Sequence, residues 1–122
     1  MTVPTHLKHT PIVVVDYLNT DISLGYGDTH YLSIGSAQWD STDFSAKTIR
    51  RSGNRWSRQS EEIPLLRLLD LAILEIAVIK GKAYSLNQTI VDKSIHQNLM
   101  NYINNHQAQI DQRLNEIMNL LK

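Results

Sequence analysis

Arg58, Arg67 and Asp70 are the residues of this sequence whose types and spacing best suit the binding of a charged ligand. Arg67 and Asp70 are three residues apart, so they would share one face of a helix. They interrupt the apolar segment Leu65–Ile79, and a charge within a protein core must be paired. Two interpretations are open: an ion pair that also ties Arg58 to the helix, or a pocket in which Asp70 acts as a base and an arginine binds an anion. We take the three as candidate ligand-binding residues and assign no catalytic residue.

Residues 47–58 form a basic segment. They hold five Lys or Arg and no acid, a net charge of +5, whereas residues 1–46 hold one Lys and five Asp, a net charge of −4. Such a segment could bind nucleic acid through phosphate contacts and base stacking, or pair with the acidic half of the chain. The zero net charge of the whole chain disfavours nucleic acid, because nucleic-acid-binding domains are usually basic. The candidate interaction residues here are Arg50, Arg51, Arg55 and Trp56.

Trp39 lies in the polar connection Gln38–Asp43. Its side chain either folds back into the core or stays exposed as an anchor for a partner, since exposed Trp residues are common at interfaces. We therefore include Trp39 among the candidate interaction residues.

Metal and nucleophile chemistry have less support in the sequence. The chain has no Cys, which excludes disulfides and thiolate ligands. Asp28 and His30 have a spacing that suits a metal on an extended chain, but two ligands are too few. No phosphate-binding loop, nucleophile elbow or zinc-protease helix motif is present. We therefore assign no metal and no cofactor.

Alternating apolar residues and turn signals predict an antiparallel meander in the first half of the chain. The β-branched run Ile12–Val15 fits a buried strand. Three further strands are predicted at His30–Ala37, Phe44–Arg51 and Arg55–Ser57, the last two joined by a turn at Ser52-Gly53-Asn54. One face of the third strand would carry Phe44, Ala46 and Thr48, and the other Ser45, Lys47 and Ile49.

A first helix is predicted from the N-cap Ser60 to about Lys80, with Gly81 as its C-terminal glycine. Glu61 and Glu62 would lie in its first turn, where carboxylates complement the macrodipole. Its apolar residues lie on nearly every side, so we expect the sheet to cover one face and another helix to cover the other.

A last helical region, Lys93–Leu121, carries one narrow apolar stripe and begins at an N-cap, Asp92 or Ser94. One unbroken helix would be ~43 Å long, more than the ~30 Å across a compact domain of this size. The helix therefore either breaks near Asn104-Asn105 or projects and pairs with a partner.

These elements predict one α+β domain of 122 residues, with a small antiparallel sheet of three or four strands packed on one face by two or three C-terminal helices. We expect a loose tail over residues 1–10, with an edge extension of the sheet as the alternative for Thr2–Thr10, a sheet part over 11–58 and a helical part over 60–122. The predicted core comprises Val13, Val15, Leu32, Ile34, Ile49, Leu65, Leu68, Leu69, Ala72, Ile73, Ile76, Leu99, Ile103 and Ile117.

The sequence predicts a cytoplasmic protein that does not contact a membrane. Residues 1–11 contain no apolar stretch of the kind found in signal peptides. Leu65–Ile79, the most apolar segment, is short for a membrane span and contains three charges.

Four short motifs resemble a family of short uncharacterised bacterial proteins classed as a domain of unknown function. They are Ser45-Ala46-Lys47, Trp56-Ser57-Arg58-Gln59-Ser60-Glu61-Glu62, Pro64-Leu65 and Leu69-Asp70-Leu71-Ala72. The resemblance implies one bacterial domain, and it implies no activity.

Three functions are compatible with the sequence. The favoured one is a non-enzymatic interaction or regulatory module that forms a homodimer or binds a second protein through the C-terminal helix. The second is a small enzyme or anionic-ligand binder that uses Arg58, Arg67 and Asp70. The third is nucleic-acid binding by residues 47–58.

Overall fold

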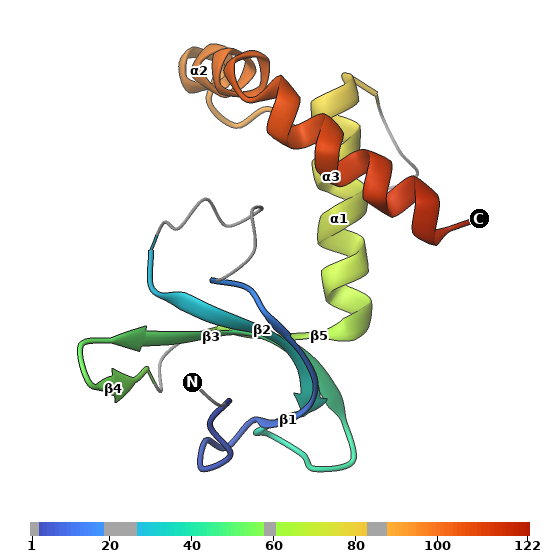
Figure 1. Cartoon of the computed structure of the whole chain (residues 1–122). Coiled ribbons are helices and arrows are strands. Elements are labelled where there is room, and N and C mark those ends of the chain that lie inside the picture. Colours follow the sequence, from blue (N-terminus) through green and yellow to red (C-terminus); the bar gives the residue numbers. More distant parts are fainter. Residues whose placement is uncertain (1–2, 19–26, 58–60, 83–87) are drawn as a thin grey trace. The chain divides into compact units, whose positions relative to one another are not determined.

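The computed structural model describes residues 3–18, 27–57, 61–82 and 88–122 (Figure 1). The described residues form five strands followed by three helices, so the α+β class predicted from the sequence is confirmed. The chain divides into two compact units, residues 1–71 and residues 72–122.

The first unit contains an antiparallel sheet. Its strands are β1 (Thr10–Asp16), β2 (Thr29–Ser36), β3 (Phe44–Ser52), β4 (Arg55–Trp56) and β5 (Glu62–Pro64). The order is β1-β2-β3-β4, with β5 paired to β3, and every pairing is antiparallel. The predicted meander is confirmed, and Gly53 in the β3–β4 turn has φ +60°, the left-handed conformation that favours glycine.

Strand register decides which side chains share a face of this sheet. Ser33 lies opposite Lys47, and Lys47 lies opposite Glu62, so these three residues share one face. Ile34 lies opposite both Val13 and Ala46, which places these three on the other face. The two faces predicted for the third strand are therefore correct.

The face that carries Ser33 and Lys47 is the buried one, because residues 3–9 lie over it. Leu7, Tyr31 and Ile49 form the core of this unit, with Val3 and Trp56 packed against them. Residues 3–9, dark blue in Figure 1, lie along one side of the sheet. The loose tail predicted for residues 1–10 is thus wrong for the described part of that segment, since Leu7 is 6% exposed and His9 is fully buried.

Most of the apolar side chains predicted as core are exposed, and four of them lie on the opposite face of the sheet. Ile49 and Ile103 are buried as predicted. Nine other predicted core residues are exposed, in the sheet and the helices alike: Val13, Val15, Leu32, Ile34, Leu68, Leu69, Ile73, Leu99 and Ile117. The prediction failed because a strand's alternation identifies its apolar face but does not say whether another segment covers that face.

The first helix, α1 (Leu65–Lys80), begins later than predicted. Glu62–Pro64 forms strand β5, so Glu62 does not lie in a helical first turn. Pro64 explains the difference, because the residue before a proline is restricted to extended conformations. The helix ends before Gly81, which has φ +63°, as predicted. Within α1 only Ala77 is buried.

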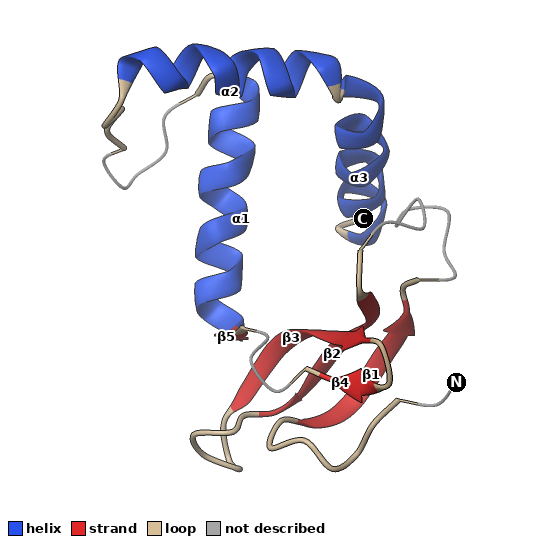
Figure 2. Cartoon of the chain, turned by 90° about the vertical axis from the view of Figure 1, so that its left-hand side faces the viewer, coloured by secondary structure: helices blue, strands red, loops and turns tan. Residues whose placement is uncertain are grey.

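The last helical region breaks into α2 (Lys93–Asn105) and α3 (Gln107–Leu120), which run in clearly different directions (Figure 2). The break falls at His106, beside the Asn104-Asn105 pair, so of the two alternatives left open by the sequence the broken helix is the one observed. Asp92 is the N-cap of α2, since its carboxylate accepts hydrogen bonds from the backbone N–H groups of Ser94 and Ile95, each at 3.0 Å. Within the described residues, no helix combines the length and the apolar character needed to cross a lipid bilayer.

Candidate functional site

The most chemically complete group of side chains in the first unit lies beneath residues 3–9. His9 Nε2 is 2.8 Å from Ser33 Oγ, and His9 Nδ1 is 3.0 Å from Ser45 Oγ and 3.1 Å from Glu62 Oε1. The Ser45 hydroxyl donates a second hydrogen bond to Glu62 Oε1. We call His9, Ser33, Ser45 and Glu62 the buried polar cluster.

Glu62 is the anionic member of this cluster. Its Oε1 also accepts a hydrogen bond from the backbone N–H of Gln38 at 3.0 Å. Burial by itself raises the pKa of the Glu62 carboxyl, but hydrogen bonds from Ser45, His9 and Gln38 outweigh burial and hold the pKa below its ordinary value. The other oxygen, Oε2, is buried and has no hydrogen-bond partner among the described residues.

Glycine at position 35 allows His9 to reach the sheet. A Cβ atom at Gly35 would lie 2.1 Å from the carbonyl oxygen of Thr10 and 2.9 Å from His9 Nε2. Real Cβ atoms do not approach other atoms so closely, so the chain can lie over this part of β2 only because Gly35 has no side chain.

Ser33, His9 and Glu62 are linked in the order hydroxyl, imidazole and carboxylate, which is the order found in serine hydrolases. The exposed fraction of Ser33 is 4%, and His9 is fully buried. A substrate carbonyl could reach Ser33 Oγ only if residues 3–9 moved away from the sheet. In the structure the cluster therefore acts as a network that holds residues 3–9 against β2, β3 and β5.

A cavity of about 400 Å³ lies beside this cluster, still within the first unit. It is lined by His6, Leu7, Lys8, Gln38 and Lys47. Lys47 is buried, with an exposed fraction of 7%. Basic and amide-bearing residues therefore make up most of this lining, as in a site for a polar ligand.

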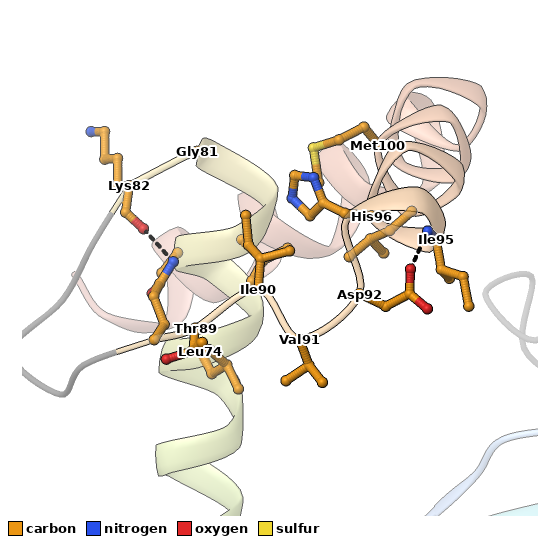
Figure 3. Close-up of a pocket in the computed structure, with 14 residues that line it drawn as sticks. Leu74, Gly81, Lys82, Thr89, Ile90, Val91, Asp92, Ile95, His96 and Met100 are labelled. Carbon is orange, nitrogen blue, oxygen red and sulfur yellow. Dashed lines mark hydrogen bonds between the residues drawn. The ribbon is translucent and has the colours of Figure 1, made fainter.

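The second unit contains a different kind of cavity, of about 620 Å³ (Figure 3). Its lining is largely apolar and comes from α1, from residues 88–92 and from the first turns of α2. Leu74 on α1 and Met100 on α2 are two of the apolar residues that line it, and His96 is the imidazole among them. Such a lining suits an apolar group rather than an ion.

A family model describing a family of unknown function, DUF6530, matches residues 1–94. The chain belongs to this family. Neither a search of curated proteins nor a search of solved structures returned a significant match. The DUF6530 match includes the whole first unit and α1, and it ends at the second residue of α2. The buried polar cluster and the cavity beside it therefore lie entirely within the DUF6530 match.

All the site residues predicted from the sequence also lie within the DUF6530 match. Arg58 is outside the described residues. Arg67 and Asp70 are both exposed on α1, and in the part of the chain that the structure describes no ion pair joins them. Of the two interpretations left open for these residues, the buried ion pair is thus absent from the described structure.

Arg50 binds an acid of the N-terminal half. Its Nε and Nη2 atoms donate to the two Asp28 carboxylate oxygens at 3.0 and 2.9 Å. The hydrogen bonds from Arg50 hold the pKa of the Asp28 carboxyl below its ordinary value. This ion pair matches the alternative in which the basic segment binds the acidic half of the same chain. It also occupies the carboxylate of Asp28, which was considered with His30 as a metal ligand.

The remaining predicted interaction residues differ in their surroundings. Trp56 is half-buried, with the Arg51 guanidinium 5.2 Å from its ring centroid and the rings of Tyr31 and His30 within 6 Å. Arg55 is exposed in the β3–β4 hairpin. Trp39 is 46% exposed, and its indole N–H donates to Asp43 at 2.7 Å. Trp39 is thus the exposed aromatic of the set.

Sequence reasoning missed the buried polar cluster because His9 was assigned to a loose tail. Ser33 and Ser45 alternate with apolar residues and look like the solvent face of a sheet, and Glu62 was expected in the first turn of a helix. Gly35, in the interior of a predicted strand, was the available signal, since such a glycine often marks a close approach of another segment. Among the described residues, no group of three His, Asp or Glu lies close enough together to hold a metal ion.

Proposed function

We propose that the protein is a non-enzymatic interaction module that forms a homodimer through the edge of β1. The observation that carries this proposal is the exposure of four consecutive apolar residues in that strand. The exposed fractions of Ile12, Val13, Val14 and Val15 are 59%, 63%, 37% and 49%. Side chains on both faces of β1 are therefore open to solvent.

β1 is also an end strand of the sheet. Among the described residues it pairs with β2 alone, so its other edge presents backbone N–H and C=O groups. Stable monomers protect such edges with lysines, prolines or bulges, because an apolar edge strand pairs readily with another chain. Pro11 and the irregular register after it protect only the first residues of β1, and Asp16 is the only charged residue of the strand.

A second copy of the chain suits this edge. Two β1 strands that pair in the antiparallel direction about Ile12–Val15 form a closed, two-fold interface. That pairing places Asp16 near the first residues of the other strand rather than beside its own counterpart. The zero net charge of the chain means that two copies do not repel each other through net charge.

The C-terminal helix predicted as the partner surface is the alternative route to association. Met118 and Leu120 on α3 are 59% and 74% exposed. The match to the family model ends before α3 and includes β1. Of the two surfaces, β1 is therefore the one within the matched region. The bacterial origin and cytoplasmic location remain predictions from the sequence, as does a ligand site at Arg58, Arg67 and Asp70.

Light scattering on the full chain over a range of concentrations tests the proposal. The unmodified protein should give the mass of a dimer. Val13→Lys should raise the dissociation constant at least about tenfold, because it brings like charges together across the two-fold axis. Val13→Thr is the matched control: it keeps a β-branched side chain without a charge and should leave the dimer intact.

Leu120→Lys separates the two surfaces. It should leave the dimer intact if β1 forms the interface, with circular dichroism confirming that each variant is folded. A monomer at every concentration, or dissociation by Leu120→Lys and not by Val13→Lys, would contradict the proposal.

A further inference from the structure

Lys47 has a largely buried side chain whose ammonium keeps access to solvent and has no counterion in the part of the chain that the structure describes. It lies in the middle of β3, and its exposed fraction is 7%. Neither of the two ion pairs among the described residues includes Lys47, and no hydrogen bond to its ammonium is found there. A charge at the end of a largely buried side chain is stabilised when a group of opposite charge lies against it.

Glu62 is the nearest acid in the strand register, since it lies opposite Lys47 on β5. Its bonded oxygen, however, is taken by His9, Ser45 and the Gln38 backbone. No ion pair within 4 Å joins Glu62 and Lys47. The Glu62 charge is therefore stabilised within the buried polar cluster, and the Lys47 charge is left for another group.

The titratable residues that line the same cavity as Lys47 are also basic. The cavity of about 400 Å³ that Lys47 lines is also lined by Lys8 and His6, and none of the described residues that line it bears a carboxylate. Gln38 adds a side-chain amide, which is a hydrogen-bond donor. The volume falls in the range of small-molecule sites, which is ~300–1,000 Å³.

We propose that this cavity binds a small molecule through an oxyanion, a carboxylate or a phosphate group. The anion lies against the ammonium groups of Lys47 and Lys8, where it supplies the counterion that the chain itself does not provide. His6 and Gln38 contribute polar contacts at the same group. The site is independent of the β1 edge, so the dimer proposal and this one fail or stand separately.

Thermal unfolding of the full chain tests the proposal with inorganic phosphate and acetate as probes and chloride at matched ionic strength as the reference. A ligand that binds only the folded state stabilises it in a concentration-dependent way. At least one of the two oxyanions should give a saturable rise in Tm that chloride does not give. The anion with the larger rise identifies the group, phosphate or carboxylate, that the site prefers.

Lys47→Met is the decisive variant, because methionine keeps an unbranched apolar stem and removes the charge. It should lose the whole oxyanion-dependent rise in Tm, while its Tm in chloride should equal or exceed that of the unmodified protein. Lys93→Met, at an exposed lysine of α2, is the matched control and should keep the full rise.

Lys8→Gln changes an exposed residue of the lining and therefore guards against a Lys47 variant that does not fold. It should shift the oxyanion concentration at half-saturation upward by about tenfold, the effect of losing one charged contact. An equal response to chloride and both oxyanions, or an unchanged oxyanion response in Lys47→Met or Lys8→Gln, overturns the proposal.

Discussion

The two faces of the sheet in the first unit differ in an unusual way, because the buried face carries a cluster of polar residues, here called the polar face, beside the apolar core residues Tyr31 and Ile49. One face carries Ser33, Ser45 and Lys47, and all three are buried. The other carries Leu32 and Ile34, which are 36% and 39% exposed. In most half-covered antiparallel sheets the apolar face is packed and the polar face is solvated.

The difference shows that a face of this sheet is buried where another segment of the chain lies over it, whatever the polarity of its side chains. Residues 3–9 lie over the polar face, and each polar atom that they bury then needs a partner. His9 provides several of those partners at once, through Ser33, Ser45 and Glu62. Polar residues can therefore form a buried face when the covering segment brings the matching donors and acceptors.

The largest predicted effect comes from removing the carboxylate that joins the covering segment to the sheet. Glu62→Ala leaves His9 Nδ1, the Ser45 hydroxyl and the Gln38 N–H without their acceptor. We expect a loss of about 3–5 kcal/mol in the free energy of unfolding, as for other broken buried ionic networks. Urea denaturation followed by Trp fluorescence measures this loss.

Glu62→Gln is the matched control for that variant. It keeps an oxygen that accepts the same hydrogen bonds and removes only the charge, so the loss should be smaller, about 1–2 kcal/mol. Equal losses in the two variants would mean that the charge, rather than the number of hydrogen bonds, holds the cluster together.

A somewhat smaller loss is expected when the close approach itself is blocked. Gly35→Ala places a Cβ 2.1 Å from the Thr10 carbonyl oxygen, so the backbone of one segment must shift. Overpacking of this kind costs about 1–3 kcal/mol. Hydrogen exchange should show that residues 7–10 lose protection first. Unchanged protection of this segment would show that His9 does not depend on Gly35.

Local signals in the sequence were sufficient for most element boundaries. Gly53 and Gly81 mark a turn and a helix end because both take the left-handed conformation. Asp92 caps α2 because its short side chain reaches two backbone N–H groups. These features depend on neighbours within a few residues, so they can be read from the chain itself.

Long-range features were out of reach for the same physical reason. His9 meets Ser45 and Glu62 across 36 and 53 residues, and no local pattern encodes that meeting. Glu62 was expected at a helix start, yet Pro64 favours an extended chain and β3 offers Glu62 a pairing partner. The candidate site depends on these contacts, which is why it appeared only with the structure.

Acid should weaken the polar face more than the apolar one. The pKa of Glu62 is lowered in the folded protein, so its contribution to stability is present above its ordinary pKa of 4.5 and is lost as the pH falls through the lowered value. The free energy of unfolding, measured in urea from pH 7 to pH 3, should fall less steeply in Glu62→Gln. Parallel curves would show that other carboxyls account for the acid sensitivity.

The smallest effect is expected on the apolar face. Ile34→Thr keeps a β-branched side chain in β2 and replaces one that is 39% exposed, so the free energy of unfolding should change by only about 0.5 kcal/mol. The measurement is the same urea titration used for Glu62→Ala, at a protein concentration low enough to keep the chain monomeric. A loss of unfolding free energy as large as that of Gly35→Ala would mean that this face is covered in solution. Only the replacement of a covered apolar side chain by a polar one lowers the free energy of unfolding by several kcal/mol. The contrast between the two faces therefore depends on Ile34→Thr being tolerated where Gly35→Ala is not.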